Sequence, residues 1–435
     1  MDKMYLCIDL KSFYASVECV KRGLDPFKTL LVVADPSRGS GGICLAASPA
    51  IKAMGVPNRC RLFEIPAGLK YIIAKPRMKL YMEISAEIYD IYLRYIDSED
   101  IHIYSIDECF IDVTPYLKAY HKTAREMAVM LTDAVYRETG ICAAAGVGTN
   151  LFLAKVALDI TAKHSPDHIG CLDEEEFCRT IWHHTPLTDI WNIGRGTAKR
   201  LKQMGAVDLC DVAHMDEKQL FREFGVNARY LIDHAHGTEP CTIADIHNYK
   251  SKSRSLSSSQ ILFENYAYED ALTVIKEMAD ALVTEMSESG LCAGSVSLGI
   301  GYADDSIPST GGTKKLNGPA SSLSAIMPAF EELCSDSYGA ACAGSQRVNG
   351  KFFDRSALPL IRRLSVGLGE LEAAGAVQQD LFSDHDKEIK EQNLRRSISL
   401  IRERYGKNAL IKGISLTEKA TAIERNALIG GHNAE

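Results

Sequence analysis

The sequence predicts an α+β protein of several domains, and three observations support this prediction. The chain has 435 residues, which is enough for two to four domains of about 100–200 residues each. Short apolar runs at 4–10, 30–35 and 142–148 have the length and composition of buried strands. Longer segments with helical spacing separate these runs, and the composition changes at the serine- and lysine-rich segment 250–260, where we expect a new domain.

The first half of the chain alternates predicted strands with predicted helices. The strand at 4–10 leads into a helix that Gly23 ends. The strand at 30–35 leads through a glycine-rich loop into a short helix that Gly55 ends. An amphipathic helix is predicted at 79–96.

A hairpin is predicted next, because 101–106 and 109–113 are two strand-like segments that flank a pair of acids. We expect one helix over 118–138, closed by Gly140, and a second helix over 151–163 that Asn150 caps.

The second half begins with short helices between about 166 and 235. A helix at 267–289 then alternates with strand-like segments at 295–303 and 359–368. Residues 367–388 resemble a linker. A helix follows in which Leu394, Ile398, Ile401 and Tyr405 are spaced for one face, and it ends at Gly406. The last thirty residues give little signal, and we expect partial disorder there.

Charge and cysteine content limit the function classes. The net charge of −8 and the pI of about 5.9 argue against nucleic acid as a partner when taken alone, so a DNA-binding role must rest on motifs. The 13 cysteines include no Cys-x-x-Cys pair, which argues against a zinc site. Four of them lie among apolar residues and are interpreted as small core side chains: Cys7, Cys19, Cys44 and Cys109.

The expected location is a reducing cytoplasm. Unpaired thiols in this number are typical of such a compartment. No signal peptide is recognised at the N-terminus, and no apolar run approaches the roughly 20 residues that span a bilayer.

Three acids interrupt or end apolar segments. Asp9 ends the first strand, and Asp107 and Glu108 lie inside the predicted hairpin. A buried acid is costly unless a cation compensates it. Adjacent strand residues face opposite sides, so Asp107 and Glu108 converge only at a turn or bulge. Hard oxygen ligands suit Mg²⁺. The alternative is that these are ordinary acids at exposed strand ends.

The two acidic segments, 8–18 (IDLKSFYASVE) and 104–113 (YSIDECFIDV), resemble the active-site pair of Y-family translesion DNA polymerases of the bacterial UmuC/DinB type. The similarity covers roughly residues 1–370, and we extend it to the tail. It implies a right-hand polymerase with a palm of mixed or antiparallel sheet plus helices, small fingers, a helical thumb and a little finger of sheet plus helices. The implied domains are palm 1–19 and 77–165, fingers 20–76, thumb 166–235, little finger 241–366, and a C-terminal segment 367–435.

The resemblance also implies roles at the active site. Asp9 and Asp107 would bridge two Mg²⁺ ions, Glu108 would hold the ion that activates the primer 3′-OH, and the carbonyl oxygen of Leu10 would complete the nucleotide-side ion. Tyr14 matches the aromatic steric gate that rejects ribonucleotides. The alternative for Tyr14 is a core aromatic residue.

Further residues are expected to bind the nucleotide. Phe13 lies beside the gate, and Lys52 and Lys155 match family residues that offset the charge of the triphosphate. The chain departs from many relatives at Pro49, where they carry a tyrosine, and at Ser12, where an aromatic is frequent. These departures put nucleotide affinity and lesion preference in question. Each lysine has a solvated surface position as its alternative.

Two regions are expected to bind primer–template DNA. The segment 193–201 resembles a helix-hairpin-helix turn, whose glycines let backbone N–H groups approach phosphates. The basic residues of the expected little finger lie in its loops and strands, while its acids gather in 264–288, which predicts a sheet facing DNA and acidic helices facing water. The predicted DNA contacts are Gly194, Arg195, Gly196, Lys199, Arg200, Lys250, Lys252, Arg254, Arg362 and Arg363, with Lys314 and Lys315 in the same basic set.

The segment 378–382 (QQDLF) resembles the peptide that binds the bacterial sliding clamp, with Gln378 as the polar anchor and Leu381 and Phe382 for an apolar pocket. The expected partners are therefore primer–template DNA, dNTPs and the sliding clamp, with accessory subunits of the SOS response as a further option. We expect a monomer without a membrane partner.

The predicted function is an error-prone, template-directed DNA polymerase for translesion synthesis and DNA repair. Two alternatives stay open. A non-catalytic DNA- and clamp-binding regulator would bind the same partners without chemistry, and a structure-specific nuclease would shorten DNA.

Overall fold

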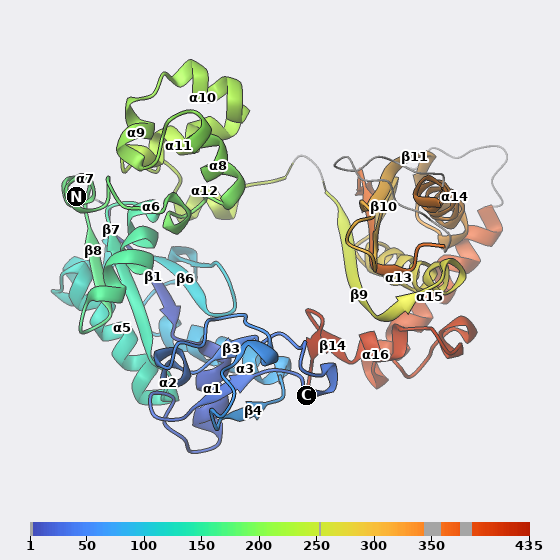
Figure 1. Ribbon diagram of the computed structural model, residues 1–435, viewed down its shortest axis with the longest axis horizontal. Coiled ribbons are helices and arrows are strands. Elements are labelled where there is room, and N and C mark those ends of the chain that lie inside the picture. Colours follow the sequence, from blue (N-terminus) through green and yellow to red (C-terminus); the bar gives the residue numbers. More distant parts are fainter. Residues whose placement is uncertain (1–2, 252–253, 343–357, 375–384) are drawn as a thin grey trace. The chain divides into compact units, whose positions relative to one another are not determined.

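The computed structural model describes residues 3–251, 254–342, 358–374 and 385–435. The chain divides into two compact units (Figure 1). Unit 1 comprises residues 1–249 and 432–435, and unit 2 comprises residues 250–431. Each unit has its own hydrophobic core.

A five-stranded sheet with the strand order β5-β6-β1-β7-β8 forms the centre of unit 1. Its strands are β1 (Tyr5–Leu10), β5 (Ile101–Ile103), β6 (Glu108–Asp112), β7 (Ala143–Gly148) and β8 (Ile169–Leu172). Strand β1 is antiparallel to both of its neighbours, and β7 and β8 are parallel. The sheet therefore includes residues up to Leu172, beyond the predicted palm boundary at 165.

The small residues of β7 allow a helix to lie directly on the sheet. A Cβ atom at Gly148 would lie 2.2 Å from the backbone nitrogen of Ala154, and one at Gly146 would lie 2.0 Å from its carbonyl oxygen. The helix is α6 (Leu151–Val156), and Asn150 caps it by accepting a hydrogen bond from the backbone of Leu153. This close packing brings Lys155 on α6 near the middle strands.

The helix predicted over 118–138 is wrong in its start, because two helices occupy this region. Helix α4 spans Thr114–Tyr120, and α5 spans Ala124–Thr139. His121 has a φ of 51°, which breaks the first helix, and Thr123 caps the second by accepting a hydrogen bond from Glu126 N. Gly140 ends α5 in the left-handed conformation, as predicted.

A small three-stranded sheet with the order β3-β2-β4 has its own cluster of buried residues, which includes Val32, Cys44 and Ile51. Its elements are β2 (Leu31–Val33), β3 (Ala46–Ala47), β4 (Ile72–Ala74) and the short helix α2 (Pro49–Ala53). Two longer helices contact each other beside it, α1 (Phe13–Lys21) and α3 (Met78–Leu93).

Short helices form the rest of unit 1, shown in green in Figure 1. They are α7 (Glu174–Thr180), α8 (Arg195–Gln203), α9 (Leu209–His214), α10 (Glu217–Phe224), α11 (Ala228–Ala235) and α12 (Ile243–Asn248). Thr242 caps α12, and Ile243 packs in the same core cluster as Tyr5 and Phe110 of the central sheet. Helix α12 therefore belongs to unit 1, and the predicted start of the little finger at 241 is too early.

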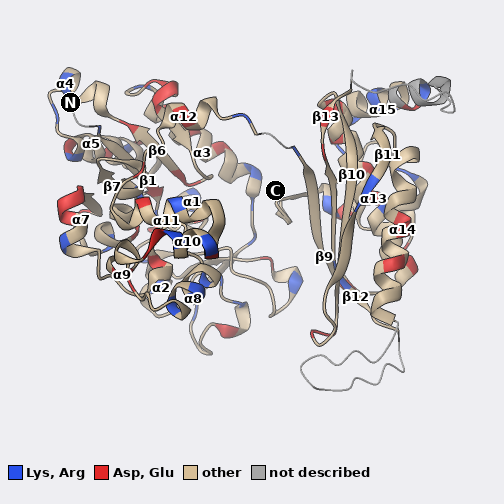
Figure 2. Ribbon diagram, turned by 90° about the horizontal axis from the view of Figure 1, so that it is seen from above, with Lys and Arg blue, Asp and Glu red and all other residues tan. Residues whose placement is uncertain are grey.

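Unit 2 contains a sheet with the order β11-β10-β12-β9. Its strands are β9 (Leu256–Tyr266), β10 (Leu291–Tyr302), β11 (Thr310–Ala320) and β12 (Ile361–Gly369), and β13 (Glu372–Ala373) pairs with β10. Helices α13 (Tyr268–Glu288) and α14 (Leu323–Cys342) lie on the same side of this sheet (Figure 2). The residues 361–373 are mostly strand, so the predicted linker starts too early.

The C-terminal residues fold against α13, so the predicted disorder is wrong. The elements that contact α13 are α15 (His385–Tyr405), a 3-10 turn (Gly413–Leu416) and α16 (Ala422–Asn426). The short strands β14 (Leu428–Ile429) and β15 (His432–Asn433) follow them along the chain. Glu277 on α13 is 5% exposed and accepts hydrogen bonds from the backbone nitrogens of Thr421 (2.8 Å) and Ala422 (3.0 Å). The acids of α13 therefore do not all face water, contrary to the sequence prediction.

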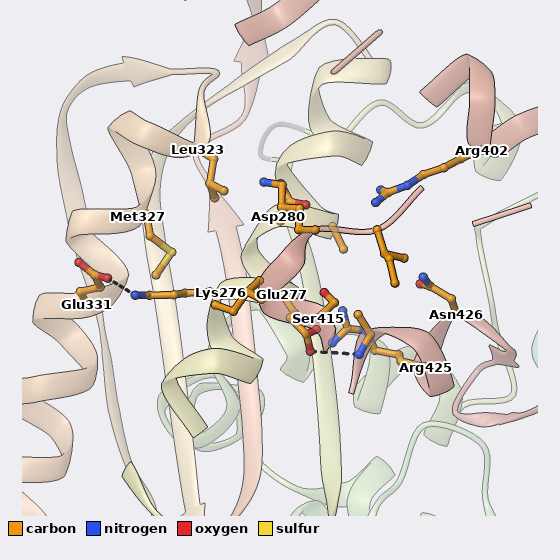
Figure 3. Close-up of a pocket in the computed structure, with 15 residues that line it drawn as sticks. Lys276, Glu277, Asp280, Leu323, Met327, Glu331, Arg402, Ser415, Arg425 and Asn426 are labelled. Atoms are coloured by element: carbon orange, nitrogen blue, oxygen red, sulfur yellow. Dashed lines mark hydrogen bonds and ion pairs between the residues drawn. The ribbon is translucent and has the colours of Figure 1, made fainter. Parts of the chain in front are cut away.

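A cavity of about 290 Å³ lies in unit 2 between α13, α14 and the C-terminal elements (Figure 3). Lys276 on its wall pairs with Glu331 at 2.8 Å, and Lys412 pairs with Asp280 at 2.8 Å. Two acids of this wall, Glu331 and Asp280, are thus engaged by basic residues of the same unit. None of the helices in the described parts of the chain is long and apolar enough to span a membrane.

Candidate active site

Three acids lie at one end of the two neighbouring strands β1 and β6. Asp9 is the second-last residue of β1 and faces Glu108, the first residue of β6, across the ladder. Asp107 lies in the bend just before β6, and its carbonyl oxygen accepts a hydrogen bond from Leu10 N at 2.9 Å. The bend supplies the turn that convergence of the two adjacent acids requires.

The electrostatics of Asp9 reflect this arrangement. The pKa of Asp9 is raised to about 7, first by burial and then by the negative charges of Asp107 and Glu108. Lys155 opposes the rise without cancelling it. A site of carboxylates that repel one another is one where a divalent cation is stabilising, and its oxygen donors match the preference of Mg²⁺.

Two of the acids are held by neighbouring side chains. Glu108 accepts hydrogen bonds from Lys155 Nζ (2.8 Å) and Cys7 Sγ (3.0 Å), and Lys155 also contacts Asp159 at 3.0 Å. Ser105 Oγ donates to Asp107 at 2.6 Å. The carboxylate oxygens of the three acids do not all lie within 4.8 Å of one another. Binding of an ion shared by all three acids therefore requires their side chains to move closer together.

Lys52 reaches the same region from α2. Its Nζ donates to Ser12 Oγ at 2.8 Å, and burial lowers its pKa while the charge of Asp9 raises it. Ser12 has a φ of 51°, a left-handed conformation that is uncommon for a residue with a side chain. The turn at Ser12 places the start of α1 immediately after β1.

Tyr14 stacks on Tyr81 of α3, with ring centroids 4.5 Å apart and an interplanar angle of 17°. Tyr14 is half-buried, so part of its ring stays accessible. Phe13 is 2% exposed. The prediction that the side chain of Phe13 contacts a nucleotide is therefore not supported, because the ring is in the core.

A buried acid, Glu18, holds Tyr81 in place through a hydrogen bond, and the sequence did not predict this role. Glu18 on α1 is fully buried and accepts hydrogen bonds from Tyr81 Oη (2.7 Å), Arg77 Nη2 (2.8 Å) and Arg22. The available signal was an acid among small and apolar residues of a helix, four positions after Tyr14.

The predicted phosphate-binding turn lies at the start of α8. Gly194 caps this helix, and a Cβ atom at Gly194 or Gly196 would meet nothing within 4 Å. These glycines are therefore not required for packing within the chain. Arg200 pairs with Glu223 and lies over the ring of Phe224, so part of its charge is engaged. Figure 2 shows the basic residues of α8 in blue.

The predicted basic residues of unit 2 differ in their surroundings. Arg363 is exposed and lies opposite the exposed Ile261 on β9, whereas Arg362 is half-buried. Lys314 faces α14 and pairs with Glu332, because it lies opposite the core residue Val296. The prediction that Lys314 lies on the open face of the sheet is therefore wrong.

The remaining predicted contacts are exposed or undescribed. Lys250 and Arg254 are exposed, and Lys315 is exposed and pairs with Glu370 at 3.4 Å. Outside the described residues lie Lys252, Gln378, Leu381 and Phe382.

Comparison with solved structures defines the class. A Y-family DNA polymerase, a chimera of Dbh and Dpo4, matches with a TM-score of 0.65 and 19% sequence identity. The match covers 85% of this chain and 99% of that chain. The protein therefore has the fold of a Y-family DNA polymerase.

The impB/mucB/samB family matches residues 8–159, and the C-terminal domain of the same family matches residues 253–381. A Bacillus subtilis protein named "Putative UV-damage repair protein UvrX" is 32% identical over 99% of this chain and 98% of its own length. "DNA polymerase IV 2" of Halalkalibacterium halodurans is 29% identical over 99% of this chain and all of its own. The chain belongs to the impB/mucB/samB family, a UmuC/DinB-like group of Y-family DNA-directed DNA polymerases. The resemblance found in the sequence is confirmed.

Proposed function

We propose that this protein extends a DNA primer on a template by translesion synthesis, with Asp9, Asp107 and Glu108 as its metal-binding acids. The observation that supports this most directly is that Asp9 faces Glu108 across the ladder, with Asp107 in the adjoining bend, so that burial and the charges of the other two acids raise the pKa of Asp9. Such a cluster is stabilised by divalent cations. Damage-induced mutagenesis is the biological role that fits a relative named as a UV-damage repair protein.

The donor set fits two Mg²⁺ ions, which would be held by the three carboxylates and the carbonyl oxygen of Leu10. When bound, the ions would lower the pKa of the primer 3′-OH and stabilise the leaving pyrophosphate. Lys155 would exchange its contact with Glu108 for the triphosphate. Lys52, which is hydrogen-bonded to Ser12 beside the acids, would bind the same triphosphate.

Tyr14 would lie against the sugar of the incoming nucleotide and reject a 2′-OH by steric overlap. Its stacking on Tyr81 and the buried contacts of Tyr81 with Glu18 support this role, because a gate must hold its position. Tyr81 and Glu18 would act as positioning residues.

The glycine turn before α8 would bind duplex phosphates through backbone N–H groups, and Arg363 and Arg254 would add contacts from unit 2. The peptide that includes Gln378, Leu381 and Phe382 would bind a bacterial sliding clamp. Accessory subunits of the damage response would be further partners. A cytoplasmic location is supported by the 13 cysteines, all of which are free thiols.

Primer extension tests the proposal. Wild-type protein with Mg²⁺, a primed template and all four dNTPs is expected to lengthen the primer, whereas Asp107→Ala is expected to lose about 1,000-fold or more in rate because several kcal/mol of charge stabilisation is removed. DNA binding by Asp107→Ala, followed by fluorescence anisotropy, is expected to stay within about threefold of wild type.

The alternatives give different results in the same assay. A non-catalytic regulator would bind primer–template without extension, and a nuclease would shorten the labelled strand. Extension by Asp107→Ala at the wild-type rate would remove Asp107 from the mechanism while leaving the polymerase assignment in place.

A further inference from the structure

A second group of ligand-type side chains lies in the helical part of unit 1, where one residue follows α7 and two lie at the start of α9. The donor atoms of His183, Asp208 and Cys210 all lie within 4.8 Å of one another. The group combines an imidazole nitrogen, a carboxylate oxygen and a sulfur. We propose that these three residues bind a transition-metal ion of the Zn²⁺ class.

The chemistry of the donors selects the metal. Zn²⁺ is bound by Cys, His and Asp side chains, whereas Mg²⁺ and Ca²⁺ prefer oxygen donors alone. The site therefore differs in preference from the carboxylates of β1 and β6. A sequence search for closely spaced cysteine pairs does not detect it, because its ligands come from two segments about 25 residues apart.

The two segments are fixed to each other before any ion binds. The carbonyl oxygen of Trp182 accepts hydrogen bonds from the backbone nitrogens of Leu209 and Cys210, both at 3.1 Å. His183 follows Trp182 directly, so its position relative to Cys210 depends on these two bonds. Ligand positions that are held by the backbone reduce the entropy that metal binding must offset.

Asp208 is oriented by a separate contact. One of its oxygens, Oδ1, caps α9 by accepting a hydrogen bond from Asp211 N at 2.8 Å. The other oxygen, Oδ2, lies 2.9 Å from Nδ1 of His183. The helix cap thus leaves one carboxylate oxygen directed at the imidazole, and ligating carboxylates in metal sites are held in this way by outer contacts.

The three donor atoms would have to move only slightly to coordinate one Zn²⁺ ion. Tetrahedral Zn²⁺ places a nitrogen and a sulfur ligand about 3.5 Å apart and a nitrogen and an oxygen ligand about 3.3 Å apart. The contact between His183 and Asp208, at 2.9 Å, would open by a few tenths of an ångström, and no separation to the sulfur would have to close by more than about 1.3 Å, since all lie within 4.8 Å. The side chain of His183 is largely exposed and is therefore able to move.

The fourth position would be taken by water, or by His214 after rotation of its side chain. This histidine lies one turn after Cys210 on α9, with Nδ1 at 3.7 Å from the sulfur and at 2.8 Å from the carbonyl oxygen of Cys210. A bound ion would tie the segment after α7 to α9 and so stabilise the helical part of unit 1.

Cobalt substitution of the purified full-length chain tests the proposal. Metal-free protein titrated with Co²⁺ is expected to develop a near-ultraviolet sulfur-to-cobalt charge-transfer band with the amplitude of one sulfur-bound ion, and Zn²⁺ in equal amount is expected to abolish the band. Cys210→Ser is expected to lose the band, and His183→Ala is expected to weaken Co²⁺ binding at least tenfold. Asp208→Asn preserves the helix cap and should also weaken binding.

Two control variants separate this site from other sulfur and histidine ligands. Cys7 lies 3.0 Å from Glu108, so Cys7→Ala is required to keep the band. His184, which pairs with Asp189 at 3.0 Å, is the neighbour of His183, and His184→Ala is expected to bind as wild type does. Zn²⁺ is expected to raise the thermal midpoint of wild type and His184→Ala by a few degrees, but not that of Cys210→Ser.

Two results would overturn the proposed metal site. A charge-transfer band that persists in Cys210→Ser, or no band in the wild type, would leave His183 and Asp208 as a surface ion pair beside an unrelated thiol. Neither result would affect the proposed polymerase activity, because primer extension with Mg²⁺ is measured separately.

Discussion

The pKa of Asp9 depends on its surroundings. The same side chain on a solvated surface would be a plain anion, but burial and two adjacent acids raise its pKa to about 7. Lys155 compensates Glu108 at 2.8 Å and leaves the remaining charge to be balanced by a cation. In our proposal, divalent cations balance this charge.

At the same scale, Tyr14 determines sugar selectivity in our proposal. Tyr14→Ala removes the ring that would overlap a 2′-OH, so ribonucleotide incorporation is expected to rise by about 10- to 200-fold relative to dNTP incorporation. Single-nucleotide insertion with matched dCTP and CTP on one template measures this ratio.

The control for the gate is Tyr81→Phe, which keeps the stacked ring and removes the hydroxyl that contacts Glu18. This variant is expected to retain most of the discrimination. Unchanged sugar selectivity in Tyr14→Ala would contradict the assignment of Tyr14 as the gate.

Among the elements, α1 and α3 are joined through one buried acid. Glu18 on α1 binds Arg77 and Tyr81 of α3, and a charged acid can be buried there because its oxygens are satisfied. Burial alone would raise the pKa of Glu18, but hydrogen bonds from Arg77, Arg22 and Tyr81 outweigh it and hold the pKa below its usual 4.5.

This link predicts a pH dependence of stability. A lowered pKa in the folded state means that Glu18 stabilises the protein above about pH 4.5 and that this contribution is lost as the pH falls below that value. Glu18→Gln is expected to lower the free energy of unfolding by about 2 kcal/mol at pH 7, because hydrogen bonds to a charged group are lost.

Urea unfolding of wild type and Glu18→Gln between pH 7 and pH 3.5 measures this effect, with the difference expected to shrink toward acid pH. Glu138→Gln, which breaks the exposed pair with Arg94, is the matched control and should change stability by less than about 1 kcal/mol. A difference that stays constant across the pH range would contradict the role of the Glu18 charge.

At the scale of the whole molecule, the sequence was sufficient for local features and insufficient for contacts between distant segments. The strand at Tyr5–Leu10 and the helix cap at Asn150 follow from apolar runs and capping residues, so they were predictable. The break between α4 and α5 was not predictable, because it depends on a left-handed conformation at His121 that a histidine does not require.

Contacts between side chains from distant segments were the main features that the sequence did not predict. Lys314 was expected on the open sheet face, but strand alternation and Glu332 place it toward α14. The stack of Tyr14 on Tyr81 joins residues far apart in sequence, and no local pattern marks it. The sequence alone did not show that the two acidic segments lie side by side. This expectation came from the resemblance to Y-family polymerases.

The C-terminal elements of unit 2 provide the last prediction. Glu277 caps the start of α16 through Thr421 and Ala422, and Arg395 and Lys412 contact Asp280 on the same face of α13. Glu277→Ala leaves the buried N–H group of Thr421 and the partly buried N–H group of Ala422 without this acceptor, which costs about 1–3 kcal/mol. Limited proteolysis is therefore expected to cut residues 407–431 several times faster in this variant.

Glu285→Ala is the matched control, since Glu285 lies on the exposed part of the same helix. It should be cut at the wild-type rate. Equal cleavage of Glu277→Ala and wild type would mean that apolar packing alone holds the C-terminal elements. Faster cleavage in Glu277→Ala alone would show that an acid on α13, which composition predicts to face water, instead determines whether the end of unit 2 stays folded.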